Sequence, residues 1–366
     1  MNPGHTAPVI GDTGPRRLSP PYDEVFLDNL LPDDPEVRRR WARERGLTSD
    51  DPATLLAEFG EDAAGSYVRT GERTEASPLV EATEADIAAR IAALATDDTA
   101  WLPPDVRTRF TLAGAQGKFT LTRIDGQWFW PTAEHASTHI VKPPSQRHRR
   151  IEVFEHASLE LARTVGLEAS HSKVTTFHGR PAFVVERWDR HDGQRLPAVD
   201  LNQALGRPTA DKYRVTAPEV ARFLAPLGLA GDFVRQLAFN TAMGNADAHA
   251  KNYSLLLDRE QPRLAPLYDT VPVYFWPAYD HRFAMPVGKA RRPMDLTVRN
   301  WRLFAEHSGL PADDVLHQAF TVMRDVAEHY EDVFAPHADS TRMRLIAKQV
   351  RVLRRVIRDS GVMRDL

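Results

Sequence analysis

The chain contains no cysteine among its 366 residues. This absence excludes disulfide bonds, cysteine-ligated zinc, iron–sulfur clusters and thiol catalysis. The chain also lacks an apolar run approaching the roughly 18 residues of a membrane span, and its Pro- and Gly-containing start has no apolar signal segment. We therefore expect a cytoplasmic protein that does not use a membrane.

An excess of charge of one sign is also lacking, because 47 basic residues stand against 50 acidic ones and the net charge is −3. No global positive field recommends the chain as a nucleic-acid binder. A local basic patch is predicted in a last helix at 341–359, which bears seven basic residues between Arg342 and Arg358 opposite an apolar stripe. We favour a packed helix with a solvated basic face, and contact with DNA or with a tRNA-bound substrate is the functional alternative.

The length suggests two domains. We predict a tail at residues 1–20, a first lobe at 21–189 and a helical second lobe at 190–366. The first lobe begins with helical spacing and then has short β-favouring runs broken by Gly, Asp and Pro, which predict an antiparallel sheet. The runs are RFTLAG, KFTLTRI, QWFWP, STHIVK, KVTTFHG and PAFVVERW, with a helix at RRIEVFEHASLELARTVGL closed by Gly166. The predicted fold class is therefore α+β, with two lobes arranged as in a protein kinase.

The segment FNTAMGNADAHAKNYSLLL places Asp247 and Asn252 five positions apart. In protein-kinase catalytic loops an Asp orients the substrate hydroxyl and an Asn five residues later binds Mg²⁺, so that one tight loop serves both nucleophile and metal. Asp269, in LAPLYDT, follows an apolar run and supplies the hard oxygen ligand that Mg²⁺ requires. Each residue alone is more often a turn or helix cap, but their order and spacing favour a catalytic site.

Lys142 ends the predicted strand STHIVK, and Pro143 stops further pairing. A lysine there can hold phosphates, whereas most lysines at strand ends are merely solvated. The helix that follows carries Glu152 and Glu155, of which Glu155 is the preferred partner for the Lys142 ammonium. Ordinary salt bridging on the helix surface explains these glutamates equally well.

Two further segments are candidates for nucleotide contacts. The loop LAGAQGK contains Gly114 and Gly117, which let backbone amides approach phosphate oxygens, although two glycines between strands more often form only a hairpin. Lys118 would add charge. The segment FVVERWD would connect the lobes, with Glu186 to Trp188 near adenine and Asp189 near the ribose, and a buried edge strand is the alternative.

These segments resemble the HipA family, the kinase toxins of bacterial toxin–antitoxin modules. The resemblance rests on LAGAQGK, STHIVKP, FEHASLELARTVGL, VVERWDR, GNADAHAKN and LAPLYDT in the family's order, and it extends from about Phe26 to the helical C-terminus. It implies a bilobal kinase-like fold, with ATP and Mg²⁺ as cofactors.

Carried over residue by residue, the resemblance implies that Asp247 is the base, that Asn252 and Asp269 bind Mg²⁺, and that Lys142 contacts the phosphates. The implied nucleotide contacts are Ala113, Gly114, Ala115, Gln116, Gly117, Lys118, Glu186, Arg187, Trp188, Asp189, His249, Lys251, Asn252, Tyr268 and Asp269.

Members of the family typically carry an autophosphorylated serine just before this glycine loop, and Thr111 occupies that position here. A phosphate on Thr111 would repel ATP and disfavour the ordered loop, whereas a simple buried threonine is the alternative. The family also has a small β-rich region before the DNLLP segment, for which only about 25 residues remain here. We expect that region to be missing or to be supplied by a separate small protein.

The expected function is therefore ATP-dependent transfer of phosphate to a protein serine or threonine, with an aminoacyl-tRNA synthetase such as the glutamyl enzyme as an implied target. A HipB-like antitoxin is the expected partner, and DNA would be contacted only through it. Two alternatives are a small-molecule phosphotransferase built on the same site and a non-catalytic module that binds an antitoxin or DNA.

Overall fold

The computed structural model describes residues 24–65, 78–103, 110–257 and 261–360. The predicted tail at 1–20 lies outside this part of the chain. The chain divides into two compact units that interleave along the sequence. Unit 1 comprises the described residues up to Glu152, then Ser170–Thr209 and the residues from Leu255 toward Arg263, and unit 2 comprises Val153–Ala169, Ala210–Ser254 and the residues from Leu264 onward. The lobe boundary near residue 190 stays a prediction.

Unit 1 begins with four helices, three of which start at residues that typically cap helices. They are α1 (Glu24–Asp28), α2 (Pro35–Arg45), α3 (Pro52–Phe59) and α4 (Glu84–Thr96). Asp34 and Asp51 cap α2 and α3, each followed by a proline at the first helical position, where its missing N–H costs nothing. Thr83 and Asp86 form a reciprocal capping box at the start of α4.

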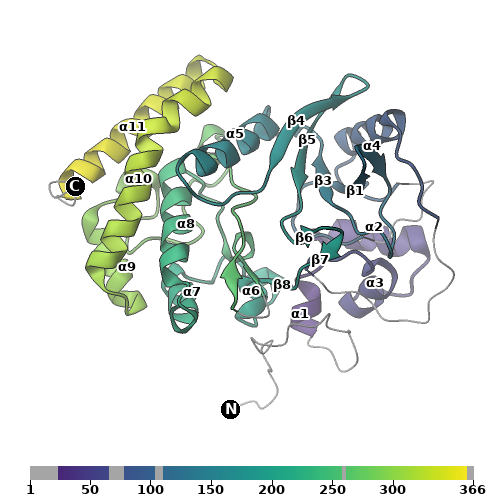
Figure 1. Cartoon of the computed structure of the whole chain (residues 1–366), viewed down its shortest axis with the longest axis horizontal. Helices are drawn as coiled ribbons and strands as arrows, with labels where there is room; N and C mark the ends of the chain where they lie inside the picture. Colours follow the sequence, from purple (N-terminus) through teal and green to yellow (C-terminus); the bar gives the residue numbers. More distant parts are fainter. Residues whose placement is uncertain (1–23, 66–77, 104–109, 258–260, 361–366) are drawn as a thin grey trace, which may run out of the picture. The chain divides into compact units, whose positions relative to one another are not determined.

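A five-stranded antiparallel sheet with the order β2-β1-β3-β5-β4 forms the centre of unit 1 (Figure 1). Its strands are β1 (Phe119–Ile124), β2 (Gln127–Phe129), β3 (His139–Lys142), β4 (Ser172–Phe177) and β5 (Arg180–Glu186). Five of the predicted β runs are confirmed by these strands. The two-residue hairpins Asp125-Gly126 and His178-Gly179 have positive φ at both positions, which matches the right-handed twist of the strands.

The predicted strand RFTLAG is wrong. Within its described part, Phe110 and Gly114 form only isolated parallel bridges, with Asp62 and Pro32 respectively. These residues therefore run alongside the segment after α1 and the segment after α3 and do not join the sheet. The periodicity of a β run reports an extended backbone, but it does not report whether a neighbouring strand is present.

Several short elements follow β5. They are β6 (Arg190–His191), β7 (Gln194–Arg195), β8 (Ala198–Asp200), α6 (Leu201–Ala204) and η1 (Thr209–Asp211), followed later by β9 (Ser254–Leu256) and β10 (Arg263–Leu264). Most of their residues belong to unit 1, and η1, β9 and β10 lie at its boundaries with unit 2. Strands β10, β9 and β8 form a second small sheet in that order. The core of unit 1 includes Trp41, whose ring packs on Phe59, Trp101 and Phe110 at centroid distances of 4.6, 6.0 and 6.1 Å.

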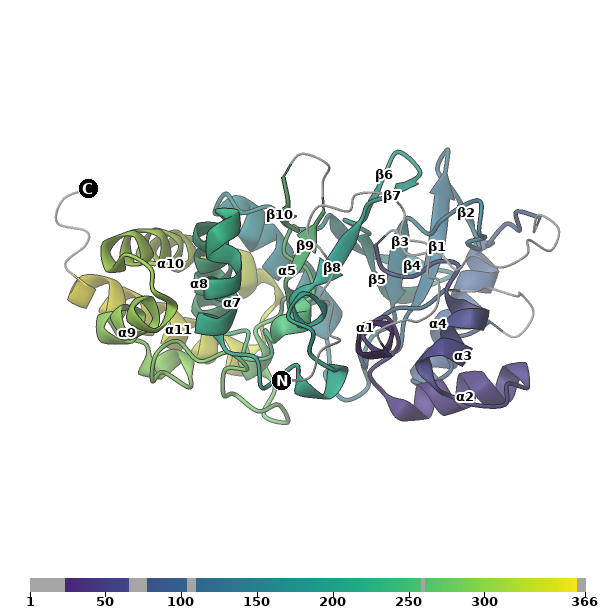
Figure 2. The ribbon, with the colours of Figure 1, turned by 90° about the horizontal axis from the view of Figure 1, so that it is seen from below.

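Unit 2 is mainly helical, as predicted for the second half of the chain. It contains α5 from Val153 onward (Ile151–Thr164), α7 (Ala217–Leu224), α8 (Ala230–Met243), α9 (Val298–Ser308), α10 (Ala312–Phe334) and α11 (Ser340–Ser360), with short turns η2 (Ala225–Leu227), η3 (Ala250–Asn252), η4 (Val273–Phe275), η5 (Pro293–Asp295) and η6 (Ala335–His337). Helix α10 packs against α8, α9 and α11, as Figures 1 and 2 show. Among the described helices, none is both long and apolar enough to cross a bilayer.

The basic face predicted for the last helix is smaller than the sequence suggested. Arg342 is buried, pairs with Asp339 at 2.7 Å, and lies over the rings of Phe154 and Trp276 at 5.2 Å each. The other six basic residues of the helix are exposed: Arg344, Lys348, Arg351, Arg354, Arg355 and Arg358. Arg342 is thus part of the core, because its guanidinium group satisfies both a carboxylate and two aromatic faces.

Candidate active site

Asp247 lies in unit 2, in the loop between α8 and η3. Helix α8 ends at Gly244, whose φ of +88° is left-handed and whose missing Cβ leaves room for the Tyr274 ring, 2.4 Å from where that atom would be. The Asp247 N–H donates to Asn245 Oδ1 at 3.2 Å, and the His249 N–H donates to the Asp247 carbonyl at 2.7 Å. The half-buried Asp247 is therefore presented by a tight, hydrogen-bonded turn.

The structure brings Asn252 and Asp269 together. Asn252 Nδ2 lies 3.2 Å from both the Asp269 carboxylate Oδ2 and the Asp269 carbonyl. Asn252 Oδ1 is buried and has no hydrogen-bond partner in the part of the chain that is described. A buried amide oxygen without a donor is costly, and a cation beside it would satisfy it. This pair is therefore suited to hold a metal ion.

Asp269 has a φ of +50°, in the left-handed region that costs most residues free energy. Asp tolerates this region better than most side chains, and the residue's conformation places its carboxylate on Asn252. No group of three or more His, Cys, Asp or Glu that could hold a metal occurs among the described residues. One carboxylate and one amide are too few for a protein-only cage, but they suit Mg²⁺, which is usually bound by one or two protein ligands with phosphates and water.

A buried polar network supports this loop from the α8 side. Asn240 Oδ1 accepts hydrogen bonds from Asn245 Nδ2 at 2.9 Å and from Thr270 Oγ1 at 2.8 Å. Asn240 Nδ2 donates to the Tyr253 hydroxyl at 3.1 Å, and burial raises the pKa of Tyr253. Since Thr270 follows Asp269 directly, this network fixes the two segments of the site against each other.

Helices α10 and α11 hold the last carbonyl groups of α8. The Tyr330 hydroxyl donates to the Met243 carbonyl at 2.8 Å, and Gln349 Nε2 donates to the Ala242 carbonyl at 2.7 Å. The Tyr274 hydroxyl lies 2.9 Å from the Tyr330 hydroxyl. These contacts satisfy carbonyls that a helix end leaves without an intrahelical donor.

Other predicted residues of unit 2 have structural partners. The Tyr268 hydroxyl donates to the Lys251 carbonyl at 2.7 Å and lies 2.7 Å from Ser254 Oγ. His249 and Lys251 are buried in the loop. Glu155 is also buried, on α5. Its pairing with Lys142 stays a prediction, because the two residues belong to different compact units.

In unit 1, Lys142 ends β3 opposite Phe183 of β5, where its ammonium lies 5.6 Å from the Phe183 ring centroid. The side chain is buried. Glu152, also of unit 1, is buried as well, its pKa is raised by burial, and its Oε2 has no hydrogen-bond partner among the described residues. Lys142 is thus set at a strand end inside the unit and is not a solvated surface lysine.

The glycine loop at 113–118 is held by the segment after α1. Gly114 has a φ of +102°, its carbonyl accepts from the Asp33 N–H at 3.1 Å, and its own N–H donates to Asp33 Oδ1 at 3.3 Å. Lys118 Nζ closes the loop by donating to the Ala113 carbonyl at 2.6 Å and lies 5.0 Å from the Trp101 ring centroid.

Thr111 lies just before this loop and is fully buried. Its hydroxyl donates to the Leu30 carbonyl at 2.7 Å and its N–H donates to the Asp62 carbonyl at 3.3 Å. A phosphate on this oxygen does not fit the observed packing, so phosphorylation of Thr111 requires the segment to move.

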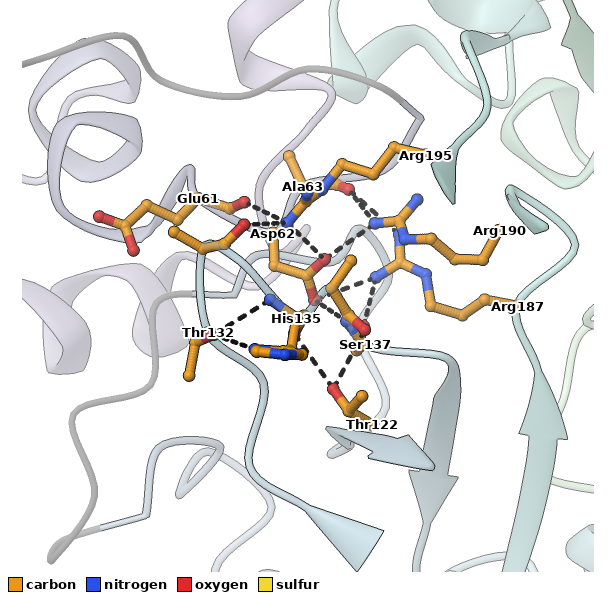
Figure 3. A network of polar contacts seen from close by, with 12 residues as sticks. Glu61, Asp62, Ala63, Thr122, Thr132, His135, Ser137, Arg187, Arg190 and Arg195 are labelled. Carbon is orange, nitrogen blue, oxygen red and sulfur yellow. Dashed lines mark hydrogen bonds and ion pairs between the residues drawn. The ribbon is translucent and has the colours of Figure 1, made fainter. Parts of the chain in front are cut away.

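A buried ion network lies beyond β5 (Figure 3). Arg187 binds Asp189 in bidentate fashion at 2.9 and 2.8 Å, and Asp62 lies 2.9 Å from Arg190. Figure 3 shows Asp62 facing Arg187, Arg190 and Arg195. Burial alone would raise the pKa of Asp62, but the charges of Arg187 and Arg190 outweigh it and lower the pKa.

The network also occupies side chains that were predicted to contact nucleotide. The Asp189 carboxylate accepts the Gly65 N–H at 2.7 Å besides the Arg187 guanidinium, and Arg187 Nη1 donates to Ser137 Oγ at 2.9 Å. Both side chains are buried. A nucleotide contact from this segment is therefore left to backbone groups and to the side chains of Glu186, which is 57% exposed, and the half-buried Trp188.

Comparison with protein families gives a match to the HipA-like C-terminal domain over residues 110–333 and to the HipA N-terminal domain over residues 15–68. The chain belongs to the HipA family. The described part of the N-terminal match contains helices α1 to α3 and the residues that hold Thr111 and the glycine loop. The resemblance inferred from the motifs is thereby confirmed.

Curated relatives and a solved structure extend this result. A Sinorhizobium fredii protein named "Putative kinase Y4mE" is 32% identical over 89% of this chain and 83% of its own length. The serine/threonine-protein kinase toxin HipA of Shewanella oneidensis is 25% identical over 90% of this chain and 80% of its own length. A structure of Shewanella oneidensis HipA with HipB and operator DNA has a TM-score of 0.76, with 24% identity, covering 94% of this chain and 88% of that chain. It shows that this HipA-family chain has the HipA fold.

Sequence reasoning missed several residues of the site. Asn240, Asn245 and Thr270 flank the motif residues, and only their polar character in apolar surroundings signals a buried network. Asp62 and Arg190 are 128 positions apart, so that no local pattern connects them. Tyr213 contacts Asp247 from 34 positions away, and its sequence context is an ordinary turn.

The network around Asp62 predicts a large effect of one truncation. Asp62→Ala would remove one of the two carboxylates that compensate the buried guanidinium groups and leave that of Asp189, so we expect it to lower the free energy of unfolding by about 3–5 kcal/mol, measured by urea denaturation. Asp280→Ala, which removes an exposed carboxylate paired with Arg282, serves as the matched control and should change stability little. Equal stability of the Asp62 variant and the wild type would show that the network does not hold this unit together.

Proposed function

We propose that this chain is an ATP- and Mg²⁺-dependent serine/threonine protein kinase. The observation that carries the proposal is the Asn252–Asp269 pair at the end of the loop that presents Asp247. The buried amide oxygen of Asn252 has no donor among the residues that the structure describes. Membership of the HipA family and the names of the curated relatives support the same reaction.

Within unit 2, the proposed roles follow from the donor set. Asp247 orients the acceptor hydroxyl and takes up its proton, and Asn252 and Asp269 would hold Mg²⁺. Bound there, Mg²⁺ would neutralise charge on the phosphate oxygens. From unit 1, we propose on the family resemblance that Lys142 and the loop at 113–118 contact those phosphates. The catalytic effect is alignment and charge neutralisation, because the phosphoryl transition state is loose.

The proposed acceptor is a serine or threonine of a protein. An aminoacyl-tRNA synthetase such as the glutamyl enzyme is the target that the family resemblance implies. A small-molecule phosphotransferase would transfer phosphate to metabolites without a protein acceptor. A non-catalytic binding module would show no ATP hydrolysis and no Mg²⁺-dependent nucleotide affinity.

Two substitutions separate the proposed roles. Asp247→Asn should lower the transfer of labelled γ-phosphate to lysate protein by about 10²–10⁴-fold while Mg·ATP still binds, because only hydroxyl orientation is lost. Asp269→Asn should abolish transfer and also the Mg²⁺-dependent gain in nucleotide affinity, measured by titration with a fluorescent ATP analogue.

Asp280→Asn is the matched control for both, since it neutralises an exposed carboxylate of the same unit. Its activity should equal that of the wild type. Full activity of the Asp247 or Asp269 variant would contradict the proposed function, and the labelled band in the wild-type lysate identifies the acceptor by mass spectrometry.

Thr111 is proposed as a site of autophosphorylation. After incubation with Mg·ATP, mass spectrometry should find phosphate at position 111 in the wild type and in the Thr111→Ser variant. It should find none at this position in Thr111→Ala or Asp247→Ala. The added charge of about −1.5 to −2 cannot stay in the buried pocket under Leu30, so limited proteolysis at 110–118 should become faster. An unmodified Thr111 in active wild-type enzyme would count against this site.

A HipB-like antitoxin is proposed as the partner, or a small protein that corresponds to the family's β-rich region. Shewanella oneidensis HipA was solved with HipB and operator DNA, which supports the first choice. The tagged chain should capture a protein encoded by a neighbouring gene, and only the complex should shift operator DNA in a gel. DNA binding by the chain alone, lost in an Arg351→Gln Arg354→Gln variant of the exposed α11 face, would contradict indirect contact.

A further inference from the structure

Tyr213 is an exposed aromatic residue that contacts the proposed catalytic base. It follows η1 in unit 2, and 53% of its surface is exposed. Its hydroxyl donates a hydrogen bond to Asp247 Oδ1 at 2.9 Å. Its ring meets the His249 ring edge to face, with centroids 5.1 Å apart and an interplanar angle of 85°.

The ring has two contacts. Besides the buried His249, the ammonium of Lys212 lies 5.1 Å from the Tyr213 ring centroid. A tyrosine has two side-chain torsions, so contacts that restrict the ring also restrict the position of its hydroxyl oxygen. These contacts and the hydrogen bond place the phenol oxygen beside one oxygen of Asp247.

The contact contributes little to the stability of the fold, because Tyr213 is half exposed and water competes for its hydroxyl group. Its effect on the carboxylate is specific. An ionised Asp accepts hydrogen bonds through its two oxygens, so a donor on Oδ1 limits rotation of the group. The loop backbone fixes the main chain of Asp247, and the phenol fixes its side chain.

We infer that Tyr213 is a positioning residue for the phosphoryl transfer, acting through Asp247. The inference rests on the proposed function. In the step concerned, the acceptor oxygen forms a bond to the γ-phosphorus, the bond from that phosphorus to the β–γ bridging oxygen breaks, and ADP leaves. The acceptor proton passes to Asp247 and from there to water. The carboxylate has to hold one orientation to receive it, and the Tyr213 hydroxyl supplies that restraint.

The test removes one oxygen atom. Tyr213→Phe keeps the ring and its packing, so thermal unfolding should not change. With Mg·ATP and either water or dephosphorylated casein as acceptor, kcat should fall about 3- to 10-fold while KM for ATP stays the same. The same substitution in an Asp247→Asn background should leave the residual rate unchanged, because the asparagine variant has already lost the carboxylate that Tyr213 orients.

Several results would overturn the inference. A higher kcat in Tyr213→Phe would mean that the hydroxyl competes with the acceptor, and an unchanged kcat would mean that it does nothing for the reaction. A changed KM for ATP alone, or an equal loss in the Asp247→Asn background, would mean that Tyr213 does not act through Asp247. If the wild type transfers phosphate to none of water, casein and lysate protein, the proposed function fails, and the inference fails with it.

Discussion

The packing of several segments of unit 1 depends on one buried carboxylate, that of Asp62. Asp62 accepts the Ser137 N–H just before β3 and lies against Arg187 and Arg190 after β5, while its carbonyl holds Thr111. One residue therefore joins the segment after α3, the approach to the glycine loop, and the start of β3 and the end of β5, which lie side by side at one end of that strand pair. A carboxylate can do this only when several donors surround it, because an isolated buried charge would cost several kcal/mol. The surrounding arginines in turn require the carboxylates of Asp62 and Asp189.

The site in unit 2 is held by neutral hydrogen bonds, where unit 1 uses buried ion pairs. The groups are neutral amides and hydroxyls, chiefly Asn240, Asn245 and Thr270, whose hydrogen bonds are all made within the unit. The network itself is neutral, and the charged residues Asp247, Lys251 and Asp269 lie on the segments that it holds. Strained backbone at Asp269 persists because this network fixes the residue after it. Unit 1 is thus stabilised by paired, buried arginine and aspartate charges. In unit 2 neutral groups hold the site, and the carboxylates of Asp247 and Asp269 take part in the proposed reaction.

The predictions from sequence succeeded where the signal is local. Five of the predicted strands and the helix closed by Gly166 follow from neighbouring residues, and they appear as expected. The spacing of Asp247, Asn252 and Asp269 predicted a shared site, and the structure places Asn252 on Asp269. Burial was harder to foresee. Arg342 was expected on a solvated face and Asp189 near a ribose, yet both are buried among partners distant in sequence. The charge of a side chain does not reveal whether residues distant in the sequence will bury it and pair with it.

The hydrogen bonds from Tyr330 and Gln349 to the last carbonyls of α8 connect the C-terminal helices α10 and α11 to the proposed active site. Met243 and Ala242 stand immediately before the turn that carries Asp247, so that the anchor of this turn lies in α10 and α11. Residues outside the site thus help to set its geometry. A substitution of Gln349 on the inner side of α11 acts on the loop, whereas a substitution of an exposed arginine on its outer side leaves this hydrogen bond intact.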